Sequence, residues 1–227
     1  MSDPVGIATE EPASGGPPAP SFEVLGADPV AHAASPTLRF TLRVADPSGR
    51  RVQGIALAAQ LNIDPAKRTY DAATRERLIE LFGAPERWAA TTRSFLWTQV
   101  GALVPPFSGQ VDFPLTVACT YDLEVAAAKY FYSLPDGEIP LSFHFSGTIL
   151  YTAEDERLQI AMVPWSCSAR FKLPVAEWKR MMALYYPGGG WVRLETATLD
   201  RLQALKARRG APSMDAYIAE LLDGEDA

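Results

Sequence analysis

Hydrophobic and polar residues alternate through most of the chain from Phe22 to about residue 173, a pattern typical of half-buried β-strands. In residues 36–46 the apolar positions that share one face are Leu38, Phe40, Leu42 and Val44. A turn sequence, DPSGR, follows, and in residues 52–64 the apolar face comprises Ile55, Leu57, Ala59, Leu61 and Ile63. We therefore expect these two strands to form a hairpin with one solvated side.

The alternation resumes farther along the chain, in residues 94–104, 111–125, 139–151 and 158–173. The turn sequence LPDGEI and the charged tip AEDER separate these segments as hairpin connections do. Residues 124–134, EVAAAKYFYSL, fit either one or two helical turns or a strand edge, because Ala-rich sequence is compatible with both.

One helix interrupts the strands at about residues 72–82. Asp71 can serve as its N-cap, and Gly83 followed by Pro85 ends it. Its apolar stripe predicts that it covers a sheet edge or one end of the fold. With seven or eight strands, one covering helix and no βαβ rhythm, the sequence predicts a mainly β fold. We expect an antiparallel β-sandwich or a partly open barrel.

The flanking regions differ from this β-sandwich domain, to which we assign residues 21–173. Residues 1–20 are rich in Pro, Gly, Ala and Glu and predict a disordered tail. In residues 174–222 the period becomes helical, and we expect a helix, a short strand at 191–194 and two further helices. An acidic tail, residues 223–227, ends the chain.

The strand and two helices expected from Trp191 to Leu222 have the order of a ribbon-helix-helix DNA-binding unit, which suggests a DNA-associated regulator. Their charges do not favour DNA, because five basic residues are nearly balanced by four acidic ones. The net charge of the whole chain is −6, so a nucleic-acid partner is not expected. We favour a helical appendage that could form a homodimer through its strand and helices.

Residues able to carry out catalysis are few. His32 lies in a Pro- and Ala-rich connection, and His144 lies on the polar face of its strand. Cys119 and Cys167 both fall on apolar strand faces, where burial makes a thiol inert, and no metal-ligand spacing is present. We therefore assign no catalytic, cofactor or metal site. The N-terminus lacks the features of a secretory signal and no apolar run is long enough to span a membrane, so we expect a cytoplasmic protein.

Aromatic residues are the more suggestive group, because exposed rings often mark a protein interface. Three stand in succession at residues 130–132, so some would point outward if this segment were a strand. A core filled with bulky rings explains the same residues equally well. Our candidate partner surface comprises Tyr130, Tyr132, Trp165, Tyr186 and Trp191.

Three long segments, YDLEVAAAKYFYSLPDGEIPLSFHFSGTILY, MVPWSCSARFKLPVAEWKRMM and YYPGGGWVRLETATLDRLQALKARRGAPSMDAYIAELL, make the chain resemble an uncharacterised family. That family is a domain of unknown function from high-GC Gram-positive bacteria, and the resemblance extends from about Phe22 to Leu222. It implies no catalytic or binding residue. It does imply an association with nickel–iron hydrogenase genes, and hence a hydrogenase subunit or maturation factor as partner. Our leading hypothesis is a non-enzymatic, protein-binding accessory scaffold; a small-molecule-binding or hydrolytic sandwich protein is a further alternative.

Overall fold

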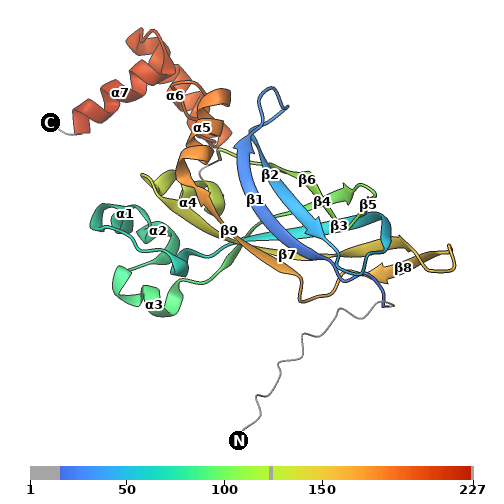
Figure 1. The fold of residues 1–227 in the computed structure, drawn as a ribbon. Coiled ribbons are helices and arrows are strands. Elements are labelled where there is room, and N and C mark those ends of the chain that lie inside the picture. Colours follow the sequence, from blue (N-terminus) through green and yellow to red (C-terminus); the bar gives the residue numbers. More distant parts are fainter. Residues whose placement is uncertain (1–15, 123–124, 226–227) are drawn as a thin grey trace, which may run out of the picture. The chain divides into compact units, whose positions relative to one another are not determined.

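The computed structural model describes residues 16–122 and 125–225 (Figure 1). Two compact units divide the chain after Gly190. The first contains all the strands, and the second contains two helices. The predicted disordered tail falls largely outside the described residues, as do the last two residues of the acidic tail.

The first unit is the predicted mainly β fold, built from two antiparallel sheets and not closed into a barrel. The smaller sheet has the order β1 (Ser21–Pro29), β2 (Thr37–Ala45) and β6 (Gln110–Ala118). The larger sheet has β3 (Arg51–Ile63) and β7 (Glu138–Thr152) at its centre. Its other strands are β4 (Phe95–Val104) and β5 (Phe107–Ser108) beside β3, and β8 (Leu158–Met162) and β9 (Ser168–Pro174) beside β7. The described residues thus form nine strands, where the sequence predicts seven or eight.

The predicted hairpin between β2 and β3 is wrong, because these consecutive strands belong to different sheets. β3 instead pairs along its length with β7, which Figure 1 shows beside it. The connection that carries the chain from one sheet to the other is held at Asp46, whose backbone N–H donates to the carbonyl of Gly109 at 2.7 Å. Alternation predicts that β2 and β3 each have one buried face. It does not show whether the two strands pair in one sheet or face each other from two packed sheets.

The core lies between the two sheets, and the predicted buried faces of β2 and β3 are confirmed. Phe40 of β2 meets Phe143 of β7 edge to face, with ring centroids 5.3 Å apart. Phe22 of β1 stacks on Phe145 of β7 at 4.3 Å. Because these rings join one sheet to the other, their burial is a main source of sandwich stability.

Helices fill the connections at one end of the sandwich. The predicted helix is confirmed but is broken at Leu78 into α1 (Ala72–Arg77) and α2 (Ile79–Phe82), and the backbone N–H of Thr74 donates to the Asp71 cap at 2.6 Å. The ambiguous Ala-rich segment forms a helix. Further helices of this unit are η1 (Pro65–Lys67), η2 (Pro85–Arg87), α3 (Trp88–Thr91), α4 (Ala126–Ser133) and α5 (Val175–Tyr185).

The α5 helix belongs to the sandwich unit, although its sequence lies beyond the residue 173 boundary proposed above. It buries Trp178 and Met181, and the Tyr185 hydroxyl donates to the carbonyl of Val30 at 2.8 Å. That hydroxyl also accepts from the backbone N–H of Ala33 at 2.9 Å. The helix is thereby fixed to the loop between β1 and β2.

The second unit consists of α6 (Thr196–Arg209) and α7 (Met214–Glu225). Gly210 ends α6 in the left-handed conformation, and the Ser213 hydroxyl caps α7 by accepting from the N–H of Ala216 at 3.0 Å. Residues 191–195 form no strand, so the predicted short strand at 191–194 is absent. Among the described helices, none has the length and apolar character needed to cross a membrane.

Candidate functional site

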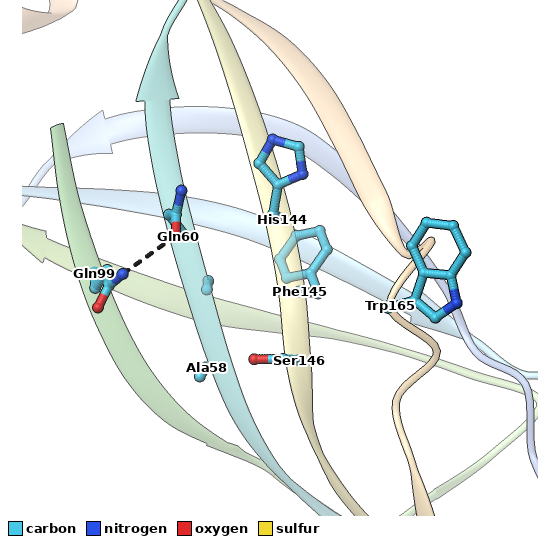
Figure 2. A pocket seen from close by; sticks show the side chains of 8 residues that line it. Ala58, Gln60, Gln99, His144, Phe145, Ser146 and Trp165 are labelled. Atoms are coloured by element: carbon cyan, nitrogen blue, oxygen red, sulfur yellow. Dashed lines mark hydrogen bonds between the residues drawn. The ribbon is translucent and has the colours of Figure 1, made fainter. Parts of the chain in front are cut away.

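The outer face of the larger sheet is built from residues of β3, β4 and β7 that alternate with the core. Directly opposed residues share a face, so Gln60 of β3 lies between Gln99 of β4 and His144 of β7. The Gln99 amide donates to the side-chain oxygen of Gln60 at 3.2 Å. Figure 2 shows this row of polar groups crossing three strands.

A shallow hollow of about 330 Å³ lies beside this row. Its floor is low because Ala58 and Ser146, which are directly opposed, have small side chains. Its lining comprises Ala58, Ala59, Gln60, Gln99, His144, Phe145, Ser146 and Trp165. None of these residues carries a fixed charge, so the hollow suits an uncharged surface with hydrogen-bonding groups.

Trp165 stands at the rim of the hollow and is 94% exposed (Figure 2). It lies in the loop between β8 and β9, which is bonded to β7 on both sides of the indole. The N–H of Val163 donates to the carbonyl of Gly147 at 2.9 Å, and the N–H of Phe145 donates to the carbonyl of Cys167 at 3.0 Å. The backbone of the turn that carries the ring is therefore anchored, so the loop loses less conformational entropy when a partner covers it.

An exposed apolar strip adjoins this rim along the edge of the sheet. On β8, Leu158, Ile160 and Met162 are 64%, 68% and 67% exposed, and all three point to the outer face. Leu150 of β7 lies directly opposite Ile160 and is also exposed. We call these four residues together with Trp165 the apolar strip. Contiguous exposed apolar surface of this kind marks an interaction site more often than scattered single residues do.

His144 is exposed, and no carboxylate lies among the described residues that line the hollow. A hydrolytic site would need an orienting partner for the imidazole, and this geometry supplies none within the hollow. Among the described residues, no group of three or more His, Cys, Asp and Glu side chains could hold a metal ion. The chemistry offered here is therefore recognition through apolar area, amides and hydroxyls.

The two cysteines are free; Cys119 is buried, whereas Cys167 is only partly buried and lies in the loop before β9, not on the strand face predicted for it. Burial raises the pKa of the Cys119 thiol to about 12, and burial also raises the pKa of Cys167. The Cys119 thiol donates to the carbonyl of Val117 at 3.5 Å, and that of Cys167 donates to the carbonyl of Pro20 at 3.3 Å. Neither is an activated nucleophile.

The aromatic residues of the predicted partner surface differ in exposure. Tyr130 is completely buried, which corrects its inclusion, and its hydroxyl lies 2.7 Å from that of Tyr70. Tyr186 is partly buried and stacks on Tyr121 with ring centroids 5.3 Å apart. The exposed members are Tyr132 at 54%, Trp165 at 94% and Trp191 at 48%.

Tyr130 and Tyr132 differ in exposure because residues 130–132 are helical. Successive helical residues point in different directions, so Tyr130 and Phe131 enter the core while Tyr132 faces outward. The sequence predicted the alternation of β8 but not the exposure of its apolar face, because alternation does not show whether other residues cover that face. It also placed Trp165 within one long strand, whereas the structure breaks that segment into β8 and β9 around Pro164.

Residues 17–227 match DUF6084, a family of unknown function. The chain belongs to this family. No curated protein matches it. Distant similarity exists to the CARDB domain of the PF1109 protein from Pyrococcus furiosus, solved in complex with di-metal ions, at 8% identity and a TM-score of 0.28 over 75% of this chain and 98% of that one. Similarity to the putative ApaA protein from Bordetella pertussis is 10% in identity, with a TM-score of 0.25 over 70% of this chain and 95% of that one. At these values neither likeness supports an argument about the function of the DUF6084 chain.

Proposed function

We propose that this DUF6084 protein works by binding another protein through the apolar strip and the adjoining hollow. The observation that carries the proposal is the exposure of Trp165 at 94% on an anchored turn, next to three exposed apolar residues of β8. Trp is prominent among the residues that dominate binding energy in interfaces. Leaving such a surface in water is unfavourable, and covering it with a partner removes that cost.

The hollow supplies the polar part of the same contact surface. Gln60 and Gln99 offer amide donors and acceptors, and Ser146 and His144 offer further ones. These groups need no counter-charge from the partner. An apolar centre flanked by uncharged polar groups is the usual composition of a protein interface. The open, shallow shape favours a broad protein surface over a small molecule, which would be only partly enclosed.

The identity of the partner rests on the family resemblance described above. That resemblance favours a nickel–iron hydrogenase subunit or maturation factor in a bacterial cytoplasm, with this protein as an accessory or assembly scaffold. The DNA-associated alternative depends on a strand at residues 191–194, and the structure has none there. We therefore keep the protein-binding function as the single proposal.

The test is a capture experiment from the native host, followed by titration of the purified candidate partner. The wild-type chain is compared with a Trp165→Ser and Ile160→Ser double variant and with the control Leu184→Ser. Leu184 is matched because it is 55% exposed but lies on α5 and not on the apolar strip. We expect hydrogenase subunits or maturation factors with the wild-type and control chains only. Equal capture by all three would refute a role for the apolar strip.

A further inference from the structure

A second concave site lies among the short helices of the sandwich unit and shares no lining residue with the hollow beside Gln60. Its volume is about 440 Å³, and ligand-binding pockets generally measure about 300–1,000 Å³. Its walls come from four segments: η1 with the loop that follows it, α1, η2, and α3 with the residue that follows it. Side chains from four segments can contact a small ligand from several sides.

Two arginines and no carboxylate are among the described residues that line this site, which we call the arginine pocket. The guanidinium of Arg68 donates to the carbonyls of Asp136 at 2.6 Å and Glu138 at 2.8 Å, so its position is fixed while other N–H donors of the group stay available. Arg75 is exposed. Neither arginine forms an ion pair within the described part of the chain. The carboxylate of Asp71, which lies between them in the sequence, caps α1.

Two aromatic rings form an apolar wall of the arginine pocket. Tyr70 and Trp88 meet at 90°, with ring centroids 5.6 Å apart. Their polar atoms hold both rings in place. The Tyr70 hydroxyl donates to the carbonyl of Pro65 at 2.8 Å, and the Trp88 N–H donates to the carbonyl of Gly83 at 2.8 Å. Because these rings are already fixed, a flat ligand ring can pack against them with little loss of side-chain entropy.

A further polar group of the pocket lacks a partner. Thr92 lines the pocket, and its hydroxyl oxygen is buried without a hydrogen bond to any described residue. A buried polar group without a partner is unfavourable, and an acceptor oxygen on a ligand can supply that partner. The hollow beside Gln60 differs because no fixed charge lines it. The two sites therefore select different ligands.

We infer that the arginine pocket binds a small organic anion in which a flat ring carries a carboxylate or a phosphate group. Guanidinium groups bind both kinds of anion through paired N–H donors, and the ring packs against Tyr70 or Trp88. A cation is disfavoured by the two arginines. An inorganic anion would leave the aromatic wall uncovered. This site is additional to the proposed protein contact and does not depend on it.

The first experiment is calorimetric titration of the full-length chain with two ring-bearing anions, indole-3-carboxylate and phenyl phosphate. Neutral indole and inorganic phosphate serve as controls, because each lacks one half of the expected ligand. We expect at least one ring-bearing anion to bind about tenfold or more tightly than both controls, since only it engages the arginines and the rings together. The stronger of the two anions identifies the preferred acidic group.

The second experiment removes one charge from the pocket. Arg75→Gln is chosen because Arg75 is exposed, whereas Arg68 also holds the turn at residues 136–138. This variant should weaken binding of the anion by about tenfold, because a charged hydrogen bond is lost. The matched control is Arg87→Gln, which is exposed on η2 but does not line the pocket, and it should bind as the wild-type chain does. Thermal unfolding should be the same for both variants.

Nuclear magnetic resonance locates the bound anion in the wild-type chain. The indole N–H signal of Trp88 is assigned by its absence in Trp88→Phe and should shift as the anion is added, while that of Trp165 stays in place. Three results would overturn the inference: neither anion binds, Arg75→Gln binds as tightly as the wild-type chain, or the Trp88 signal does not move. None of these results bears on the apolar strip.

Discussion

Both faces of the larger sheet contain apolar residues, but those on the inner face are buried and those on the outer face are exposed. On the inner face of β7, Phe143, Phe145 and Ile149 are at most 2% exposed and pack on the smaller sheet. On the outer face, alternate positions of the same strand hold His144 and Leu150, both exposed. The difference teaches that an apolar residue of this fold contributes to stability where the second sheet or a helix covers it.

This comparison predicts that stability and binding can be separated by substitutions on alternate positions. Inner-face changes should lower the free energy of unfolding and affect binding only through loss of fold. Outer-face changes should leave unfolding almost unchanged and affect association directly.

The largest effect is expected at Phe143, which contacts Phe40 across the core. Replacing it with Ala removes a ring from a fully buried site and leaves a cavity, so Phe143→Ala should lower the free energy of unfolding by about 4 kcal/mol. Denaturant unfolding followed by circular dichroism measures the loss. The outer-face control Ser146→Ala should change it by less than about 0.5 kcal/mol. Similar losses in both variants would contradict the assignment of stability to the inner face.

A comparable effect is expected at Gly147, where a side chain would overlap the backbone of β3. Its φ is +148°, and a Cβ at this position would lie 2.1 Å from the carbonyl oxygen of Ala56. Gly147→Ala should therefore cost about 3 kcal/mol through strain and overlap. The control is Gly101→Ala, whose Cβ would lie 3.9 Å from the Leu57 carbonyl oxygen, an ordinary contact. If Gly147→Ala melts at the temperature of the wild-type chain, the close approach of the two strands is wrong.

A smaller, pH-dependent effect is expected at Asp64, which is 6% exposed. Burial disfavours its ionised form, but hydrogen bonds from Lys67, Ser142 and Ser94 outweigh this and lower the pKa of the carboxyl. A depressed folded-state pKa stabilises the fold above the unfolded pKa, and this stability is lost as the pH falls through the folded value, below about pH 4.

The test for this site is Asp64→Asn, which should cost about 2 kcal/mol at neutral pH because it weakens the bond to Lys67, now 2.6 Å long. Unfolding is measured at several pH values, and the acid-dependent loss should be smaller in the variant than in the wild-type chain. The same acid slope in both proteins would assign the pH dependence to other carboxylates.

The smallest effect on stability is expected on the apolar strip. Ile160 is 68% exposed, so Ile160→Ser should change the free energy of unfolding by less than about 0.5 kcal/mol. Binding of the partner should nevertheless weaken, because the lost area belongs to the contact. Parallel unfolding and titration measurements check both parts. A large loss of stability here would show that the outer face is covered in the free protein.

The sequence by itself determined which face of β2, β3 and β7 is buried. The apolar positions of β2, β3 and β7 were predicted correctly because the side-chain period of two is a property of the extended backbone, whatever lies beside it. The Asp71 cap was predicted correctly because a cap acts within one helical turn. The position of His144 on the outer face was likewise predicted from its own segment.

Only the tertiary structure decided which strands pair and which surfaces stay open. β3 pairs with β7 and not with the preceding β2, and Tyr130 is enclosed by Phe82 and Phe95 from distant segments. The bare outer face of β8 follows from the same long-range arrangement. Periodicity assigns a side chain to a face of its own element. Whether that face or edge is covered depends on contacts between residues far apart in the chain, which no local pattern contains.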